Sequence, residues 1–324
     1  MRARDFTPAR WLPGPHLPTL WASLCRRPPS VPLTLERCEL ADGDFVDLAW
    51  TPAPTGPCVV VLHGLEGSRH SPYVRALLAA LHAAGYRAVL MHFRGCSGEP
   101  NRRDRSYHSG DTGDVAAVCA HIGRRDGRLP FAAVGYSLGG NVLLKWLGEK
   151  GARQPLTTAV AVSVPFDLAA CADRLNQGAS RFYQWHLLRS MQAKFAAKFR
   201  ARPAPLAVPY PRAFTTFWAF DDAVTAPLHG FRDAAEYYAR SSSRAWLAHI
   251  AIPTLIVHAA NDPFVPASAI PDAWELAPLV TLELAAGGGH VGFVAGWLPG
   301  RARYWLEARI VAHLNAVRSE YAAG

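Results

Sequence analysis

The sequence predicts an α/β protein in which a mostly parallel, eight-stranded sheet is flanked by helices and carries a helical cap insertion. Three observations support this class. Short apolar runs alternate with amphipathic stretches along most of the 324 residues. The run Val59–Leu62 is apolar at every position, which is typical of a strand buried on both faces. The alternation fails between about residues 166 and 245, where aromatic and basic residues become frequent.

Each element follows from its own pattern. The runs predicted as strands are Leu35–Leu40, Phe45–Trp50, Val59–Leu62, Arg87–Met91, Phe131–Gly135, Ala159–Ser163, Thr254–His258 and Val280–Leu284. The amphipathic stretches predicted as helices include Tyr73–Ala84, Asp114–Ile122, Val142–Lys150 and a late one at about Tyr304–Val317. Since strands and helices alternate, the strands should run mostly parallel, with helices covering both faces.

The same patterns divide the chain into three parts. Residues 1–30 are predicted as an N-terminal arm that packs on the domain. Residues 31–165 and 246–324 form the core, and residues 166–245 form a helical cap or lid. Insertions of this kind often cover active sites. The alternative is ordinary helical packing without substrate contact.

The N-terminus and the cysteines bear on the cellular compartment. Residues 1–27 are broken by four prolines and lack the continuous apolar segment of a signal peptide, and no apolar run is long enough for a transmembrane helix. The six cysteines form no C-x-x-C pair, and their spacing suggests neither a disulfide framework nor a zinc site. We therefore expect a cytoplasmic protein.

The chain carries a formal net charge of +9, and most of its basic residues are arginine. Such a charge can attract an anionic partner, such as a phospholipid surface, a CoA ester or a nucleic acid, or it can simply be a solvated surface. No nucleic-acid-binding module accompanies the charge, so no nucleic-acid partner is predicted. Peripheral contact with a membrane or lipid surface stays open, and the sequence predicts no oligomeric state.

One short motif carries the strongest chemical signal. Gly135-Tyr136-Ser137-Leu138-Gly139 lies between a predicted strand and a predicted helix. A G-x-S-x-G motif in this context forms a sharp, strained turn that exposes the serine hydroxyl above the sheet. Ser137 is therefore the candidate nucleophile.

A serine nucleophile needs a base, and the base needs a carboxylate that orients it. In this strand–turn–helix architecture the chain order is serine, acid, histidine. Asp262 follows the strand Thr254–His258, and His290 follows the last strand in a glycine-rich loop. They are the candidate acid and base. Asp167 is the more serious rival because it also follows a strand; the weaker rivals, in the insertion, are Asp221, Asp222 and Asp233. His258 lies inside a strand and is interpreted as a core residue.

An oxyanion hole needs two N–H donors. One is expected from Leu138, which follows the candidate nucleophile. The other is expected from Leu65, in the loop His63-Gly64-Leu65-Glu66-Gly67 after a buried strand. His63 is interpreted as a brace for that loop.

Several stretches of the chain together resemble the YheT-like family of the AB hydrolase (alpha/beta-hydrolase) superfamily. They include 63–67, 93–101, 107–110, 135–141, 165–168, 220–227, 262–264 and 289–293, as well as 14–20 in the arm. The resemblance covers nearly the whole length. It implies an alpha/beta-hydrolase fold, a triad of Ser137, Asp262 and His290, no metal or organic cofactor, and carboxylic esters of short to medium acyl chains as substrates. Relatives often have Asp-Asp-Pro-Phe where this chain has Asn261-Asp262-Pro263-Phe264, so the acid itself is retained.

The leading hypothesis is a serine hydrolase that acts on small ester or acyl substrates, including lipids. A second hypothesis is transfer of the acyl group from a thioester to an alcohol with the same residues. A third, from another class, is a non-catalytic lipid-binding or scaffold protein of the same fold, which the complete set of candidate residues argues against.

Overall fold

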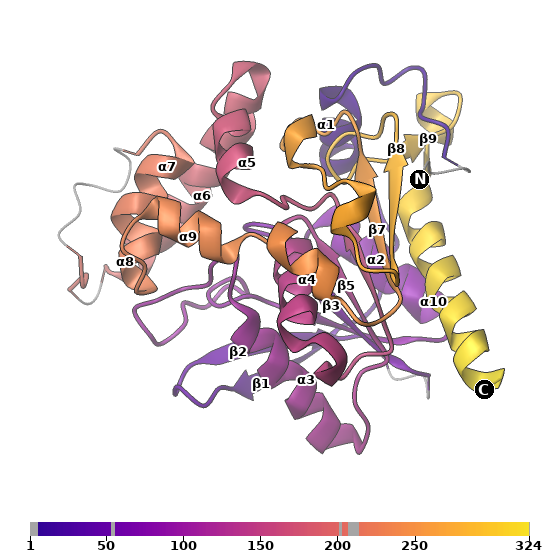
Figure 1. The fold of residues 1–324 in the computed structure, drawn as a ribbon, viewed down its shortest axis with the longest axis horizontal. Helices are drawn as coiled ribbons and strands as arrows, with labels where there is room; N and C mark the ends of the chain where they lie inside the picture. The colour runs from indigo at the N-terminus through magenta and orange to yellow at the C-terminus, as the bar shows by residue number, and fades with distance from the viewer. Residues whose placement is uncertain (1–5, 53–55, 201–202, 207–213, 324) are drawn as a thin grey trace.

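The structure is a computed structural model that describes residues 6–52, 56–200, 203–206 and 214–323. Its centre is an eight-stranded sheet in the order β1-β2-β4-β3-β5-β6-β7-β8 (Figure 1). The strands are β1 (Thr34–Glu39), β2 (Phe45–Trp50), β3 (Cys58–Leu62), β4 (Arg87–Met91), β5 (Ala132–Tyr136), β6 (Thr158–Val162), β7 (Thr254–Ala259) and β8 (Val280–Ala285). Strand β2 is antiparallel to β1 and to β4, and the remaining neighbours are parallel. The predicted eight-stranded, mostly parallel sheet is confirmed.

Helices cover both faces of this sheet. Helices α2 (Pro72–Ala83) and α10 (Trp305–Ala323) pack on one face, and α3 (Thr112–Asp126) and α4 (Leu138–Lys150) pack on the other. Successive side chains of β3 point to opposite faces of the sheet. Val59 and Val61 pack on the face covered by α2 and α10, and Val60 and Leu62 pack on the face covered by α3 and α4. Burial on both faces explains why this strand is apolar at every position.

Shorter elements complete the core and the arm. The arm contains helix α1 (His16–Leu24), which was not among the helices expected from the sequence pattern. A small hairpin of β9 (Val294–Ala295) and β10 (Arg303–Tyr304) packs beside it. The short 3₁₀ helices are η1 (Gly151–Arg153), η2 (Gly178–Ser180), η5 (Arg244–His249), η6 (Ala267–Ala269), η7 (Ala273–Glu275) and η8 (Pro299–Arg301).

The segment after β6 forms a group of helices beside the sheet, at the left of Figure 1. They are α5 (Leu168–Leu175), α6 (Arg181–Lys198), α7 (Phe217–Phe220), a π-helical turn (Asp221–Thr225), α8 (Ala226–Leu228) and α9 (Ala234–Ser241). These helices share an apolar cluster of their own, in which aromatic side chains such as Phe217, Phe220 and Tyr237 are buried. We refer to this group as the cap. Its limits at residues 166 and 245, and its role as a lid, stay predictions.

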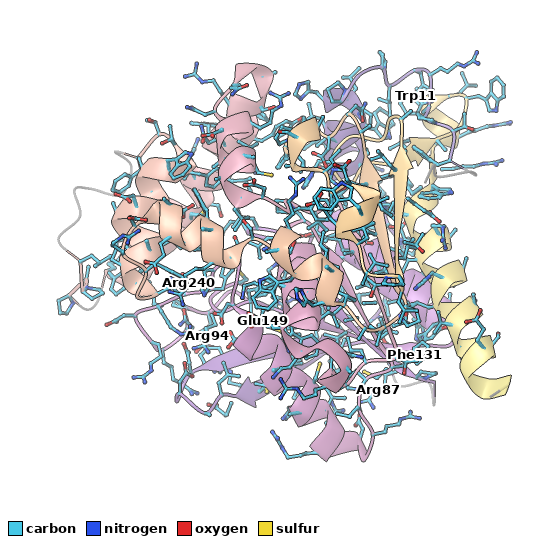
Figure 2. The ribbon with its side chains drawn as sticks, in the orientation of Figure 1. Trp11, Arg87, Arg94, Phe131, Glu149 and Arg240 are labelled. Carbon is cyan, nitrogen blue, oxygen red and sulfur yellow. The ribbon has the colours of Figure 1, made fainter. Side chains whose placement is uncertain are left out.

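A buried charge cluster holds the loop after β4. Arg94, labelled in Figure 2, forms a two-pronged ion pair with Asp114 of α3 (2.6 and 2.7 Å) and further pairs with Asp42 and Asp44. Because Arg94 is almost fully buried, these carboxylates supply the hydrogen bonds that water cannot. The pairs fix the loop that forms one wall of the site described below.

The turn between β5 and α4 depends on a glycine at its second helical position. A Cβ atom on Gly139 would lie 2.5 Å from the carbonyl oxygen of His63 and 2.6 Å from that of Leu62. Both contacts are with backbone, which cannot move without shifting β3. The strand and the helix therefore approach each other as closely as they do only because this residue has no side chain.

We expect Gly139→Ala to lower the free energy of unfolding by about 1–3 kcal/mol and to reduce activity, because the turn must shift to admit the methyl group. Thermal unfolding and ester turnover measure the two effects. Gly113 is a matched control because it is also the second residue of its helix, and a Cβ there would meet nothing closer than 4.0 Å. Gly113→Ala should leave stability equal or slightly higher. Equal stability of the two variants would contradict this account of the turn.

Candidate active site

Ser137 stands at the sharp turn between β5 and α4. Its backbone has φ 49° and ψ −119°, a strained conformation for a residue with a side chain, and its N–H donates to the carbonyl of Val162 on the neighbouring strand. The strain is held by the strand before the residue and the helix after it. The turn therefore projects the hydroxyl out of the end of the sheet, as the motif predicts.

The structure brings the three residues of the predicted triad together. His290 Nε2 lies 3.0 Å from Ser137 Oγ, and His290 Nδ1 lies 2.8 Å from Asp262 Oδ2. Asp262 is buried, and its other oxygen accepts the N–H of Phe264 at 2.8 Å. The Phe264 ring stacks on the imidazole with centroids 4.0 Å apart and planes 4° apart. These contacts fix the orientation of the imidazole.

The loop after β3 lies against the serine, because a Cβ on Gly64 would be 3.3 Å from Ser137 Cβ. The N–H of Gly64 donates to Tyr73 Oη (2.8 Å), and the N–H of Glu66 donates to Tyr107 Oη (3.0 Å). Between these two, the N–H of Leu65 has no hydrogen-bond acceptor among the described residues. The two tyrosines thus accept the hydrogen bonds of the neighbouring N–H groups, and the N–H of Leu65, the predicted oxyanion-hole donor, stays available.

Leu138 provides the other predicted donor. It is the first residue of α4, so its N–H has no intrahelical acceptor, and none is found elsewhere in the described chain. The start of a helix also favours developing negative charge. Leu65 and Leu138 therefore both lie beside the serine, and the N–H group of each has no other acceptor among the described residues.

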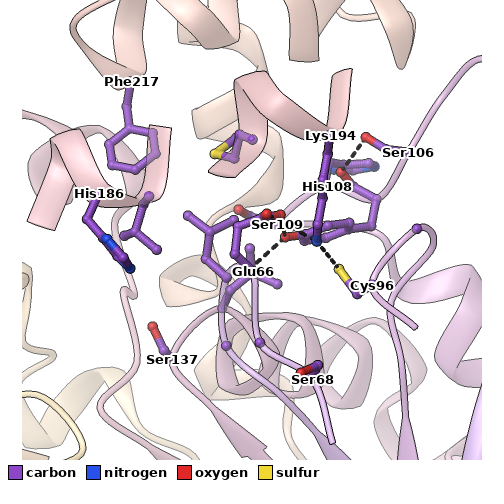
Figure 3. Close-up of a pocket in the computed structure, with 18 of the residues that line it drawn as sticks. Glu66, Ser68, Cys96, Ser106, His108, Ser109, Ser137, His186, Lys194 and Phe217 are labelled. Carbon is purple, nitrogen blue, oxygen red and sulfur yellow. Dashed lines mark hydrogen bonds and ion pairs between the residues drawn. The ribbon is translucent and has the colours of Figure 1, made fainter. Parts of the chain in front are cut away.

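A cavity of about 860 Å³ opens beside Ser137 and extends beneath the cap. In Figure 3 Ser137 lies at one side, with His186 and Phe217 of the cap above it. Most of the wall is apolar, and it is contributed by the cap, α1 and the loops after β3 and β4. A cavity of this size and character suits an apolar ligand group of moderate length.

Comparison with known proteins agrees with this geometry. A family described as "alpha/beta hydrolase fold" matches residues 57–296. A protein of Escherichia coli strain K12 named "Putative esterase YheT" is 45% identical over 94% of this chain and 92% of its own length. The chain belongs to the alpha/beta hydrolase family, within its YheT-like branch.

Two further alpha/beta hydrolases are similar over most of the chain. The protein "Phospholipase ABHD3" of Mus musculus is 30% identical over 89% of this chain and 75% of its own length. The solved structure of the esterase Pf2001 of Pyrococcus furiosus has a TM-score of 0.58 and 16% identity, and covers 90% of this chain and 99% of that one. At this identity the second likeness bears on the fold alone.

The rival acids of this alpha/beta hydrolase have other partners. Asp167 caps α5, accepting the N–H of Ala170 at 3.1 Å. Asp221 is buried in the cap against the hydroxyls of Thr225 and Tyr238, and burial raises its pKa to about 6. Asp222 accepts the N–H of Ala234, and Asp233 caps α9. The structure gives none of them a hydrogen bond to His290.

The other two histidines singled out by the sequence are buried. Burial lowers the pKa of His63 to about 3, and this ring bridges Gly64 O and the N–H of Phe93. His63 therefore ties the loop after β3 to the chain after β4, as a brace would. His258 has no hydrogen-bond partner among the described residues, and burial lowers its pKa to about 4.

No sequence pattern pointed to the residues that hold the His290 loop. The N–H of His290 donates to Thr19 Oγ1 on α1 (2.9 Å), and the N–H of Val291 donates to Ser163 Oγ (3.0 Å). Val291 has a positive φ of 57°, which these bonds help to maintain. Thr19 is 271 positions from His290, so no local pattern links them. The arm is thus part of the site.

A second missed contact joins the cap to the loop that carries Leu65. Lys194 of α6 forms an ion pair with Glu66 (3.1 Å) and also contacts the thiol of Cys96, as the dashed lines in Figure 3 show. Ser190 of the same helix donates to Glu66 as well. Burial raises the pKa of Cys96 to about 11, so this thiol stays protonated. The position of α6 is therefore linked directly to the loop after β3.

We expect Thr19→Val to lower kcat about tenfold and leave KM nearly unchanged. The isosteric side chain keeps the packing but removes the hydroxyl that accepts the N–H of His290 and donates to Pro15 O, at a cost of about 1–3 kcal/mol. Steady-state kinetics with a p-nitrophenyl ester measures the effect. Thr19→Ser retains the hydroxyl and should restore most of kcat. If the valine and serine variants had equal kcat values, the hydrogen bond would have no role.

Proposed function

We propose that this alpha/beta hydrolase is a carboxylic ester hydrolase with Ser137 as nucleophile, His290 as base and Asp262 as the carboxylate that orients the base. The observation that carries the proposal is the continuous hydrogen-bonded chain from Ser137 Oγ through the imidazole to Asp262, with distances of 3.0 and 2.8 Å. The names of the relatives, an esterase and a phospholipase, support the same reaction class.

The geometry suits acyl transfer through a covalent intermediate. His290 Nε2 takes the proton as Ser137 Oγ attacks the ester carbonyl carbon, and it then gives that proton to the leaving alcohol. Asp262 holds the Nδ1–H tautomer and stabilises the imidazolium. Water, deprotonated by the same histidine, hydrolyses the acyl-enzyme and restores the serine.

The carbonyl oxygen becomes negatively charged in the tetrahedral intermediates. The N–H groups of Leu65 and Leu138 are proposed to hold it, because both lie beside the serine without another acceptor among the described residues. Each such donor contributes about 2.7–4 kcal/mol to the transition state in comparable enzymes. Leu65 belongs to a loop held by hydrogen bonds, and Leu138 is the first residue of a helix. Their N–H groups therefore need to move little to meet the charge that develops on the oxygen.

The substrate is proposed to be an ester of a short- to medium-chain acid, including lipid esters. The apolar wall of the cavity of about 860 Å³ favours an alkyl chain over a charged group next to the scissile carbonyl. Within the described residues no cluster of His, Cys, Asp or Glu could hold a metal ion. None of the helices there has the length and apolar character needed to cross a bilayer.

A series of p-nitrophenyl esters from acetyl to palmitoyl tests this function. We expect kcat/KM to rise from acetyl to a maximum at a medium chain and to fall for palmitoyl. The same assay with added alcohol, followed by product analysis, distinguishes hydrolysis from acyl transfer. Absence of turnover with the whole series by folded protein would contradict the proposal, and ester formation exceeding acid release would favour the transferase.

A further inference from the structure

Three segments that are far apart in the sequence are joined by hydrogen bonds beside the cavity. They are residues 6–33, which include the described part of the arm, helix α6 (Arg181–Lys198), and residues 291–306, which include the hairpin. A hydrogen bond of 3.1 Å between His16 Nδ1 and the Tyr183 hydroxyl joins the arm to α6. The Trp11 indole N–H donates to Gly296 O (3.0 Å) and joins the arm to the hairpin. In Figure 1, α1 and β9 lie at the same edge of the molecule, and Figure 2 labels Trp11 there. We call these three segments the mouth face.

The mouth face exposes an unusual share of large apolar side chains. Ten such side chains are exposed among the described residues, and six of them lie on this face: Leu17, Leu24, Phe182, Trp185, Trp297 and Leu298. Trp297 is 88% exposed and Leu24 is 78% exposed. Leu24 and Phe182 also line the cavity, so the apolar surface continues into it. Exposed apolar residues gathered around an opening indicate a binding surface.

The same face is rich in basic residues. The three segments contain nine Lys and Arg residues and no Asp or Glu, while the remaining 25 Lys and Arg residues equal the 25 Asp and Glu residues of the chain. The three segments therefore hold nine positive charges and no negative one, and of these Lys194 and Arg26 form ion pairs with Glu66 and Glu307, which lie outside the segments. Two of the nine, Lys194 and Lys198, line the cavity.

The six others are exposed arginines without an ion pair to any described residue: Arg10, Arg27, Arg181, Arg189, Arg301 and Arg303. They flank the apolar side chains, since Arg181 adjoins Phe182 and Arg189 lies over the ring of Trp185. An arginine beside an exposed aromatic ring can contact a phosphate while the ring enters an apolar layer.

We propose that the mouth face docks on a bilayer that contains anionic phospholipids. The tryptophan, phenylalanine and leucine side chains would enter the boundary between headgroups and acyl chains, and the arginines would contact the phosphates. A second copy of the chain is disfavoured because it would bring a like-charged face into contact. A nucleic acid would match the charge but would leave the apolar side chains around the opening without a partner.

Docking in this orientation would place the cavity mouth against the lipid. An apolar acyl chain could then enter without crossing water. This last step rests on the proposed ester hydrolase function, whereas the docking itself depends only on the charge and the apolar side chains of the face.

Co-sedimentation of the full-length protein with vesicles tests the docking. One vesicle contains phosphatidylcholine alone, and the other contains phosphatidylcholine and phosphatidylglycerol at two to one. We expect binding to the second, weakened by salt, and little binding to the first. The variant pairs are Trp297→Ala with Leu298→Ala and Arg301→Glu with Arg303→Glu. None of these residues lines the cavity. We expect the vesicle dissociation constant to rise about tenfold for the first pair and about 30-fold for the second.

Matched changes outside the mouth face are the controls. Trp274→Ala removes a tryptophan that is 81% exposed, and Arg124→Glu with Arg153→Glu reverses two exposed charges. These variants should bind as the wild type does. The proposal is overturned if no vesicle binds, if mouth-face and control variants lose binding equally, or if the mouth-face variants abolish only self-association or DNA binding.

Catalysis and docking are separated by two measurements. Ser137→Ala should bind anionic vesicles like the wild type, and both mouth-face pairs should hydrolyse soluble p-nitrophenyl butyrate at the wild-type rate. Failure of the vesicle experiment would leave the triad intact as a proposal. Conversely, an active Ser137→Ala protein would remove the proposed mechanism without affecting the docking.

Discussion

Replacement of Ser137 by alanine is expected to lower kcat for a p-nitrophenyl ester by about 10⁶-fold, the scale seen when an enzyme of this type loses its nucleophile. The reason is geometric. The hydroxyl is the reactive oxygen that His290 contacts, at 3.0 Å, and the strained turn holds it at the opening of the cavity. Alanine can adopt the same turn, so the loss should reflect chemistry rather than folding. Steady-state turnover at saturating substrate measures the change.

Two controls make this result interpretable. Ser319→Ala removes an exposed hydroxyl on α10, far from the site in the fold, and should retain full activity. The Ser137→Ala protein should unfold at nearly the same temperature as the wild type. If it kept more than about one hundredth of the wild-type kcat, another nucleophile would have to act.

Asp262→Asn is expected to reduce kcat by about 10⁴-fold while the protein stays folded. The carboxylate accepts a hydrogen bond from His290 Nδ1 and so keeps the proton off Nε2, which must accept from Ser137. An asparagine amide can donate instead, which favours the wrong tautomer, and it cannot stabilise the imidazolium. Turnover measured across a range of pH separates this loss from a simple change in pH optimum.

The rival carboxylate supplies the matched control for this prediction. Asp167 also follows a strand, but it caps α5. Asn is as good a helix cap as Asp, so Asp167→Asn should keep both stability and activity. A large loss of kcat in Asp167→Asn, with an active Asp262→Asn, would exchange the roles of the two residues.

The parts of the fold predicted best are those with local causes. The strand β3 could be predicted because burial on both faces demands an apolar residue at each position. The turn at Ser137 could be predicted because close packing of strand and helix demands glycine at Gly135 and Gly139. In both cases a few adjacent residues carry the whole physical requirement.

The contacts that tune the site could not be predicted in this way. Thr19 holds His290 across 271 positions, and Tyr107 holds Glu66 across 41. Threonine and tyrosine hydroxyls occur throughout the chain, so only the fold identifies the two that meet these N–H groups. Helix α1 was missed for a related reason, because the prolines around it hide its pattern and packing on the core stabilises it.

The location of the net charge is a third feature that could not be predicted from the sequence. The net charge of +9 is visible in the composition, and a diffuse surface was the simplest interpretation of it. The fold joins the arm, α6 and the hairpin through hydrogen bonds and so brings nine basic residues together beside the cavity. Composition alone contains no information about which segments become neighbours.

The central claim is that Ser137 becomes covalently acylated with the help of His290. Labelling the folded protein with a fluorophosphonate, followed by intact mass measurement and peptide mapping, tests it most directly. The account predicts one adduct per chain on Ser137, a sharp loss of labelling rate in Asp262→Asn, and none in Ser137→Ala. Labelling at another residue, or no labelling of an active protein, would contradict it.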